Sequence, residues 1–110
     1  MDRKKKLYND ILNALTLIEE FTITVNLFEE YISDSKTKSA VERQLSIVGE
    51  ALTQLRKLDA EELAHTKQII GLRNMIVHAY DTIDDSIIWS IVKRHIAPLK
   101  QEVVEKLMND

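Results

Sequence analysis

The sequence contains no cysteine, and its 110 residues include only two glycines and a single proline. Without cysteine, neither a disulfide framework nor a thiolate-bound metal cluster can form, which excludes thiol redox chemistry and zinc knuckles. Few glycines and prolines leave few places for tight turns, and the remaining composition, rich in Leu, Ile, Ala, Glu and Lys, favours helix. The sequence therefore predicts an all-α protein.

Long apolar runs are also missing. No stretch is long enough to span a bilayer as a helix. The basic start at residues 3–6 is soon interrupted by Asn9 and Asp10, so it does not continue into the apolar segment of a signal peptide. A formal charge of −3 argues against a broad basic surface for nucleic acid. We expect a cytoplasmic protein that binds neither membrane nor DNA, and any contact with RNA must be local.

Apolar periodicity predicts a first helix from Lys4 to Glu20, because apolar residues recur there at spacings of three and four. The next segment, Phe21 to Leu27, alternates apolar and polar residues like a strand, but a lone strand has nothing to pair with. We therefore expect an irregular end to the first helix, followed by a short helix that Asn26 caps together with Glu29.

A polar segment from Ser33 to Ser39 predicts a break before a second long helix, which should run to Lys57. The apolar stripe of this helix keeps a seven-residue rhythm and consists of Val41, Leu45, Val48, Leu52 and Leu55. Gly49 lies inside the helix, where it costs about 1 kcal/mol relative to alanine. We expect this glycine to allow the close approach of a neighbouring backbone.

Two more helices complete the predicted fold. A third long helix should run from about Thr66 to Tyr80, after a capping pair formed by Asp59 and Glu62. The last helix should begin near Asp84, whose carboxylate suits the positive end of the helix dipole. Pro98 lies inside this last helix and lacks a backbone N–H, so we expect a kink there.

The segment Gly71-Leu-Arg-Asn-Met-Ile-Val-His-Ala-Tyr80 places a cation, an amide, an imidazole and a phenol within eight residues. On a helical wheel of about 100° per residue, one side of this helix is apolar and faces the core. Arg73 and His78 share the other side but are about 140° apart, so they do not point at the same atom. Either the long arginine reaches in from the edge, or a two-fold axis brings the arginine of one chain toward the histidine of another.

These side chains suit the cleavage of RNA without a metal. Arginine offers a fork of donors for a phosphate, and histidine, with a reference pKa of about 6.5, exchanges protons near neutral pH. The ribose 2′-OH must lose a proton and the leaving oxygen must gain one, which is the work of such groups. The same spacing is also that of an ordinary solvated helix face, so the spacing alone leaves the function open.

The segment around Arg73 and His78 resembles the motif of HepT toxins in the HEPN superfamily, in which arginine, four residues, histidine, any residue and tyrosine follow one another. The resemblance extends to residues 40–51 and 83–99, and together it covers most of residues 5–105. It implies the HEPN fold, an antiparallel bundle of four main helices with a short extra helix in a single domain over residues 1–110. It also implies a homodimer in which the two motifs meet in a cleft at the interface.

The resemblance implies a toxin that is a metal-independent endoribonuclease without a cofactor. Arg73 and His78 match the catalytic positions, and Asn74 matches the polar residue that often follows the arginine. The implied antitoxin is a minimal nucleotidyltransferase, which in several systems transfers AMP to the motif tyrosine. Here that tyrosine is Tyr80.

Glu50 and Arg43 lie two turns apart on one face of the second long helix. They are candidates to support the cleft, or they form an ordinary surface pair worth a few tenths of a kcal/mol. The spacings of His65 and His95 fit no metal-ligand motif, so we expect no metal site.

Two other functions remain open from the sequence. One is a non-catalytic subunit that presents nucleotide or substrate to a nucleotidyltransferase complex. The other is a purely structural helical dimer. Cleavage of RNA in excess EDTA separates the ribonuclease from both alternatives.

Overall fold

The computed structural model describes residues 2–78 and 83–109, and no strand occurs in these ranges. The described residues form six helices, namely α1 (Arg3–Thr22), α2 (Phe28–Ile32), α3 (Ser35–Lys57), α4 (Thr66–Val77), α5 (Asp85–Arg94) and α6 (Ile96–Met108). None of these helices combines the length and the apolar character needed to cross a membrane.

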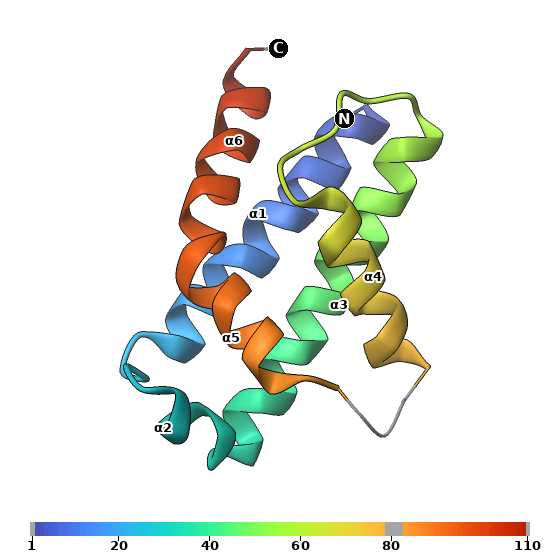
Figure 1. Ribbon diagram of the computed structural model, residues 1–110. Helices are drawn as coiled ribbons and strands as arrows, with labels where there is room; N and C mark the ends of the chain where they lie inside the picture. The colour runs from blue at the N-terminus through green and yellow to red at the C-terminus, as the bar shows by residue number, and fades with distance from the viewer. Residues whose placement is uncertain (1, 79–82, 110) are drawn as a thin grey trace.

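The long helices α1 and α3 run antiparallel at the centre of the molecule (Figure 1). Helix α4 lies against α3, and α6 lies against α1 in the opposite direction. The short helix α2 lies at the end of the bundle opposite the two chain termini. This arrangement confirms the predicted all-α, antiparallel bundle.

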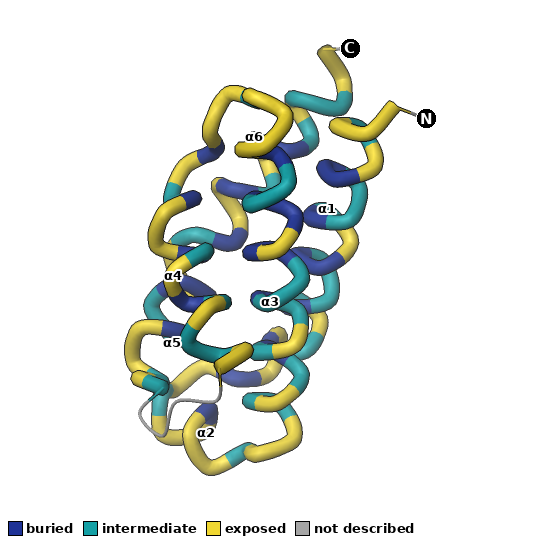
Figure 2. Tube along the Cα trace, turned by 90° about the vertical axis from the view of Figure 1, so that its right-hand side faces the viewer, coloured by how far each residue is buried: buried dark blue, intermediate teal, exposed yellow. Residues whose placement is uncertain are grey.

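The core lies between α1 and α3 and is extended by the inner faces of α4, α5 and α6 (Figure 2). The predicted stripes are its main part. In α1 the buried apolar residues are Leu7, Tyr8, Ile11, Ala14, Leu15 and Ile18, and in α3 they are Val41, Leu45, Val48, Ala51, Leu52 and Leu55. Burying one such leucine or isoleucine fully contributes about 1.5–3 kcal/mol, so this shared interface fixes how the two central helices are placed.

The predicted break after the short helix is present but covers only residues 33–34, because α3 already begins at Ser35. Asp34 caps the helix: its side chain accepts hydrogen bonds from the backbone N–H of Thr37 at 3.0 Å and from the Thr37 hydroxyl at 2.7 Å. These hydrogen bonds lower the pKa of Asp34. The polar residues 35–39 are therefore the first turns of a capped helix and not part of a loop.

Two predicted caps are also wrong. The residue before α2 is Leu27, and the Glu30 side chain, not that of Glu29, accepts the Leu27 backbone N–H at 3.0 Å. Asp59 does not cap α4, because it has a left-handed φ of 54° just after the end of α3. The residue before α4 is His65.

The predicted last helix is two helices, α5 and α6, that meet at His95. Asp84 caps α5 as expected, and its side chain accepts the backbone N–H of Ser86 at 2.9 Å. Pro98 lies in the first turn of α6, where a helix does not need the missing N–H. The helix therefore breaks completely at His95, about one turn before Pro98, instead of bending at the proline. The described residues form five main helices where four were expected.

Candidate active site

Gly49 allows α4 to lie close to α3 at the position of Arg73. An added Cβ at Gly49 would overlap the Cβ of Arg73, and it would lie 2.8 Å from the Arg73 Cγ and 3.3 Å from the carbonyl oxygen of Ile69. Only glycine fits this spacing without a shift. The close approach expected at Gly49 is confirmed, and it sets the position of Arg73.

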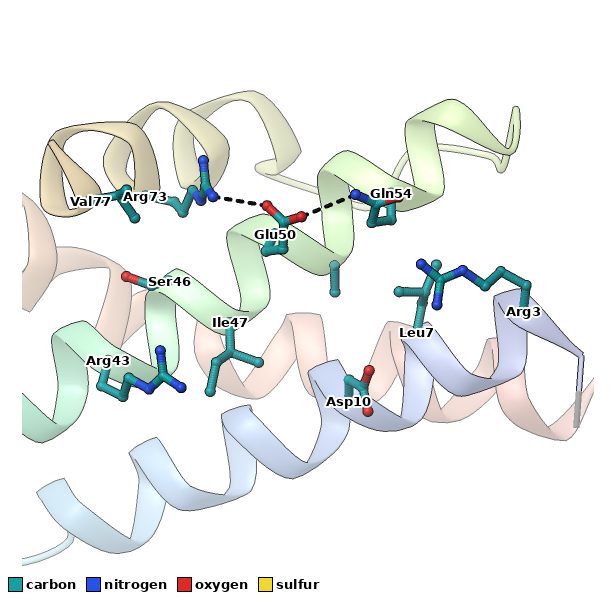
Figure 3. Close-up of a pocket in the computed structure, with 11 residues that line it drawn as sticks. Arg3, Leu7, Asp10, Arg43, Ser46, Ile47, Glu50, Gln54, Arg73 and Val77 are labelled. Carbon is teal, nitrogen blue, oxygen red and sulfur yellow. Dashed lines mark hydrogen bonds and ion pairs between the residues drawn. The ribbon is translucent and has the colours of Figure 1, made fainter.

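A cleft of about 380 Å³ runs between α1, α3 and α4 (Figure 3). The guanidinium of Arg73 lies at this cleft, next to Glu50 on the facing helix. The charged residues that line the cleft are Arg3 and Asp10 from α1, Arg43 and Glu50 from α3, and Arg73 from α4. Three helices therefore bring three arginines to one hollow.

Two side chains hold the guanidinium of Arg73. Its Nη2 atom lies 2.9 Å from Oε2 of Glu50, and its Nη1 atom donates to Oδ1 of Asn74 at 3.1 Å. The amide of Gln54 donates to the other Glu50 oxygen at 3.0 Å, which fixes the carboxylate (Figure 3). The Nε atom of Arg73 is buried and has no hydrogen-bond partner in the described structure.

The cleft has an excess of positive charge. Its two carboxylates are already paired, Glu50 with Arg73 and Asp10 with Lys6 at 2.8 Å. Arg3 and Arg43 form no ion pair with the described residues. Cations gathered in a hollow with partly apolar walls attract an anion, and the fork of an arginine suits a phosphate best.

His78 is placed differently from the other candidate residues. It is exposed, it directly follows the last residue of α4, and its backbone N–H donates to the Asn74 carbonyl at 3.1 Å. His78 is not among the residues that line the cleft. The expectation that α4 continues through His78 is therefore wrong, and the expected end of that helix at Tyr80 lies outside the described residues.

Within one chain, the structure thus brings together Arg73, Asn74 and Glu50, with Arg43 on the wall of the same cleft. Sequence reasoning missed several residues of this cleft, among them Gln54 and Arg3. Gln54 lies one turn beyond Glu50, so helical spacing alone would have found it. Arg3 belongs to α1, far away in the sequence, and no local pattern connects it with Arg73.

The other two histidines pack against each other. The rings of His65 and His95 have their centroids 3.7 Å apart. Burial, and to a smaller extent the neighbouring charge of His65, lowers the pKa of His95. Among residues 2–78 and 83–109, no three histidine, aspartate or glutamate side chains gather in a way that would hold a metal ion.

Comparison with known proteins places the chain in a family. The family model described as Ribonuclease HepT-like matches residues 11–105. A candidate RNase of Methanocaldococcus jannaschii is 36% identical over 93% of this chain and 94% of its own length. A protein of Thermococcus cleftensis named as a probable ribonuclease HepT is 37% identical over 91% of this chain and 93% of its own length.

A further relative from Methanocaldococcus jannaschii, which is named as a gamma-glutamylcyclotransferase and candidate RNase, is 30% identical over the whole chain and half of its own length. No solved structure matches the chain. The family match extends from α1 into α6 and includes the segment with Arg73 and His78. The chain belongs to the ribonuclease HepT-like family.

Proposed function

We propose that this protein is an endoribonuclease that cleaves RNA without a metal ion. The observation that carries the proposal is the position of Arg73, whose guanidinium lies at a cleft with two further arginines. Its buried Nε has no hydrogen-bond partner among residues 2–78 and 83–109, which costs roughly 1–3 kcal/mol and is one mark of a group with a catalytic role. The names of the relatives, which describe them as ribonucleases, support the same function.

In the proposed reaction, Arg73 holds the scissile phosphate and His78 transfers protons. A base removes the proton of the ribose 2′-OH, and this oxygen attacks the adjacent phosphorus. The bond to the 5′-oxygen of the next nucleotide then breaks, and that oxygen receives a proton. Arg73 stabilises the negative charge that develops on the phosphate oxygens. The products carry a 2′,3′-cyclic phosphate and a 5′-hydroxyl group.

Three neighbours of Arg73 have supporting roles in this proposal. Glu50 and Asn74 position the guanidinium, because each holds one of its terminal nitrogens. The Glu50 carboxylate also neutralises Arg73 until a phosphate takes its place. Arg43 lines the cleft on the side of α1 and α3 and adds positive charge there.

We propose that the complete site needs two copies of the chain. Within one copy, Arg73 lines the cleft and His78 does not. A two-fold axis beside the end of α4 would bring His78 of a second copy to the cleft of the first. Val77, the last residue of α4, is 50% exposed next to His78, and an apolar side chain in this position suits an interface.

The proposed activity is tested by incubating the purified protein with RNA in excess EDTA. We expect cleavage, with cyclic phosphate ends detected by mass spectrometry of the fragments. If the RNA stays intact, or if cleavage needs an added divalent cation, the proposal is wrong. RNA or nucleotide binding without cleavage would then favour a binding subunit of a nucleotidyltransferase complex.

We further propose that the protein is the toxin of a toxin–antitoxin pair, with a minimal nucleotidyltransferase as antitoxin. The antitoxin would transfer AMP from ATP to the phenolic oxygen of Tyr80, with release of pyrophosphate. Tyr80 lies two residues after His78 in the sequence. An attached AMP adds a phosphodiester charge to the motif that contains Arg73, and we expect this charge to compete with the RNA phosphate and to repel it.

Replacing Tyr80 by phenylalanine should keep at least part of the RNA cleavage but prevent neutralisation by adenylylation. The measurement is the intact mass and the cleavage activity after incubation with nucleotidyltransferase and ATP. Tyr8→Phe is the matched control, because Tyr8 is only 7% exposed and should not accept AMP. If Tyr80→Phe still gains AMP, the acceptor lies elsewhere. If the parent is inhibited without a gain in mass, the antitoxin blocks the cleft instead.

A further inference from the structure

A second basic hollow adjoins the Arg73 cleft at the start of α1. This pocket has a volume of about 510 Å³ and is lined by Asp2, Arg3, Lys4, Lys5, Tyr8, Leu58 and Lys106. We call it the amino-terminal pocket. Four of its seven lining residues are basic, although the whole chain has a net charge of −3. Positive charge is therefore gathered at this pocket in spite of the negative net charge.

Arg3 connects the two hollows, because it lines both the cleft and the amino-terminal pocket. In the cleft, Arg43 and Arg73 lie toward one end, on facing helices, and Arg3 lies toward the other end (Figure 3). The cleft extends along α3 from Arg43 to Gln54, which is about 16 Å at the helical rise of about 1.5 Å per residue. A basic surface thus passes from the cleft over Arg3 and ends among the lysines of the pocket.

Asp2 is the acidic residue that lines the amino-terminal pocket beside its four basic residues, so the lining keeps an excess of positive charge. Asp2 is engaged as the cap of α1 and accepts the backbone N–H of Lys5 at 2.9 Å. Lys106 lies 3.4 Å from Glu61, but the Glu61 side chain is 82% exposed. Such a solvent-exposed pair is weak, and a phosphate can replace the carboxylate. Lys4 is exposed as well.

We propose that the amino-terminal pocket is a phosphate-binding subsite for a single-stranded RNA that extends from the Arg73 cleft over Arg3. This inference rests on the proposed ribonuclease function. The strand must be single because the attacking 2′-OH has to move into line with the leaving 5′-oxygen, and a regular A-form duplex does not allow this movement. The subsite binds the part of the RNA strand that extends beyond the scissile phosphate, so the protein should bind long RNA more tightly than short RNA.

The subsite recognises phosphates and not bases. Lysines on flexible stems suit contacts with the backbone, which carry no sequence information. The aromatic residue of the pocket, Tyr8, is only 7% exposed, so its ring is not available as a stacking platform. Binding in the pocket should therefore depend on the length of the RNA and on salt, and only weakly on sequence.

The test measures RNA binding of Lys4→Ala/Lys5→Ala in a His78→Ala background, which prevents cleavage during the experiment. Both substitutions keep the cap of α1, because Asp2 bonds the backbone of Lys5 and not its side chain. The matched control is Lys36→Ala/Lys67→Ala, since these two exposed lysines line neither hollow. Both double variants change the net charge equally.

The probes are single-stranded RNAs of about 4 and about 16 nucleotides, within the range of known single-strand binding sites. In the control, the longer RNA should bind more tightly, with a strong salt dependence. In Lys4→Ala/Lys5→Ala, the longer RNA should lose most of its advantage in affinity over the shorter RNA. The slope of log Kd against log salt should fall by about 1.4, which is about 0.7 for each lost phosphate contact. The affinity for the longer RNA should fall about tenfold at moderate salt.

Equal affinities and slopes in the two double variants would overturn the subsite. Cleavage of RNA by the unmodified protein in EDTA is scored separately. If the protein cleaves RNA and the two variants bind alike, the subsite is wrong and the ribonuclease function stands. If the unmodified protein does not cleave RNA but the length effect still depends on Lys4 and Lys5, the function is wrong and the subsite stands.

Discussion

Replacing His78 by alanine is expected to lower the rate of RNA cleavage by about a hundredfold or more, the usual loss when a proton-transferring side chain is removed. Arg73→Ala should cause a loss of about a hundredfold to a thousandfold, because the charge that develops on the phosphate loses its main partner. The measurement is the single-turnover rate at saturating protein. A single-turnover rate reports the bond-breaking step without product release.

Both variants should keep the fold. His78 is exposed and follows the end of α4, and the Arg73 side chain is partly exposed at the cleft. Arg94→Ala is the matched control for Arg73, because Arg94 is an exposed arginine on α5 and does not line the cleft. It should cleave RNA at the parental rate. A parental rate in His78→Ala or Arg73→Ala would refute the catalytic assignment, and an equal loss of helical signal would make the residue structural.

Gly49→Ala should reduce both stability and cleavage. The new methyl group would overlap the stem of Arg73, so α4 must move away from α3. Overpacking of this kind costs about 1–3 kcal/mol. A displacement of about 1 Å at a reacting group can lower a rate by about a hundredfold, so we expect cleavage to fall at least tenfold. Thermal unfolding and the single-turnover rate measure the two effects.

Gly71→Ala is the matched control for this substitution. Gly71 lies in α4, and nothing lies within 4 Å of a Cβ added there. The alanine should therefore stabilise the protein by about 0.5–1 kcal/mol through its higher helix propensity, without an effect on cleavage. If Gly49→Ala were as stable and as active as Gly71→Ala, the close approach of α4 to α3 would not position Arg73.

The sequence predicted the central helices well because their apolar residues repeat with helical spacing. The stripe from Val41 to Leu55 is buried as expected, and so is the stripe from Leu7 to Ile18. Helix ends were less accurate, since they depend on single side-chain hydrogen bonds. The bond between Asp34 and Thr37 starts α3 inside a polar segment, where hydrophobic periodicity carries no signal.

Part of the candidate site could also be predicted. The motif predicts Arg73 and Asn74 as site residues. Gly49 predicts the close approach of a neighbouring helix, although not which residue lies against it. The cleft itself could not be predicted, because Arg3 reaches it only through the packing of α1 on α3. The wheel angle of about 140° between Arg73 and His78 assumed a continuous helix. Helix α4 ends at Val77, but the His78 backbone N–H still donates to the Asn74 carbonyl, so the angle applies as far as His78 and no further.

The proposed site, with Arg73 from one copy and His78 from another, is tested most directly by mixing two inactive variants. RNA cleavage in excess EDTA is measured for the parent, for Arg73→Ala, for His78→Ala, and for the two variants after they have exchanged subunits. Each variant alone should be nearly inactive. Random exchange makes half of the dimers mixed, and each mixed dimer has one intact site of two, so the mixture should regain about a quarter of the parental activity. A mixture as inactive as its components would contradict a site shared between two copies, and cleavage by His78→Ala alone at the parental rate would contradict the catalytic role of His78.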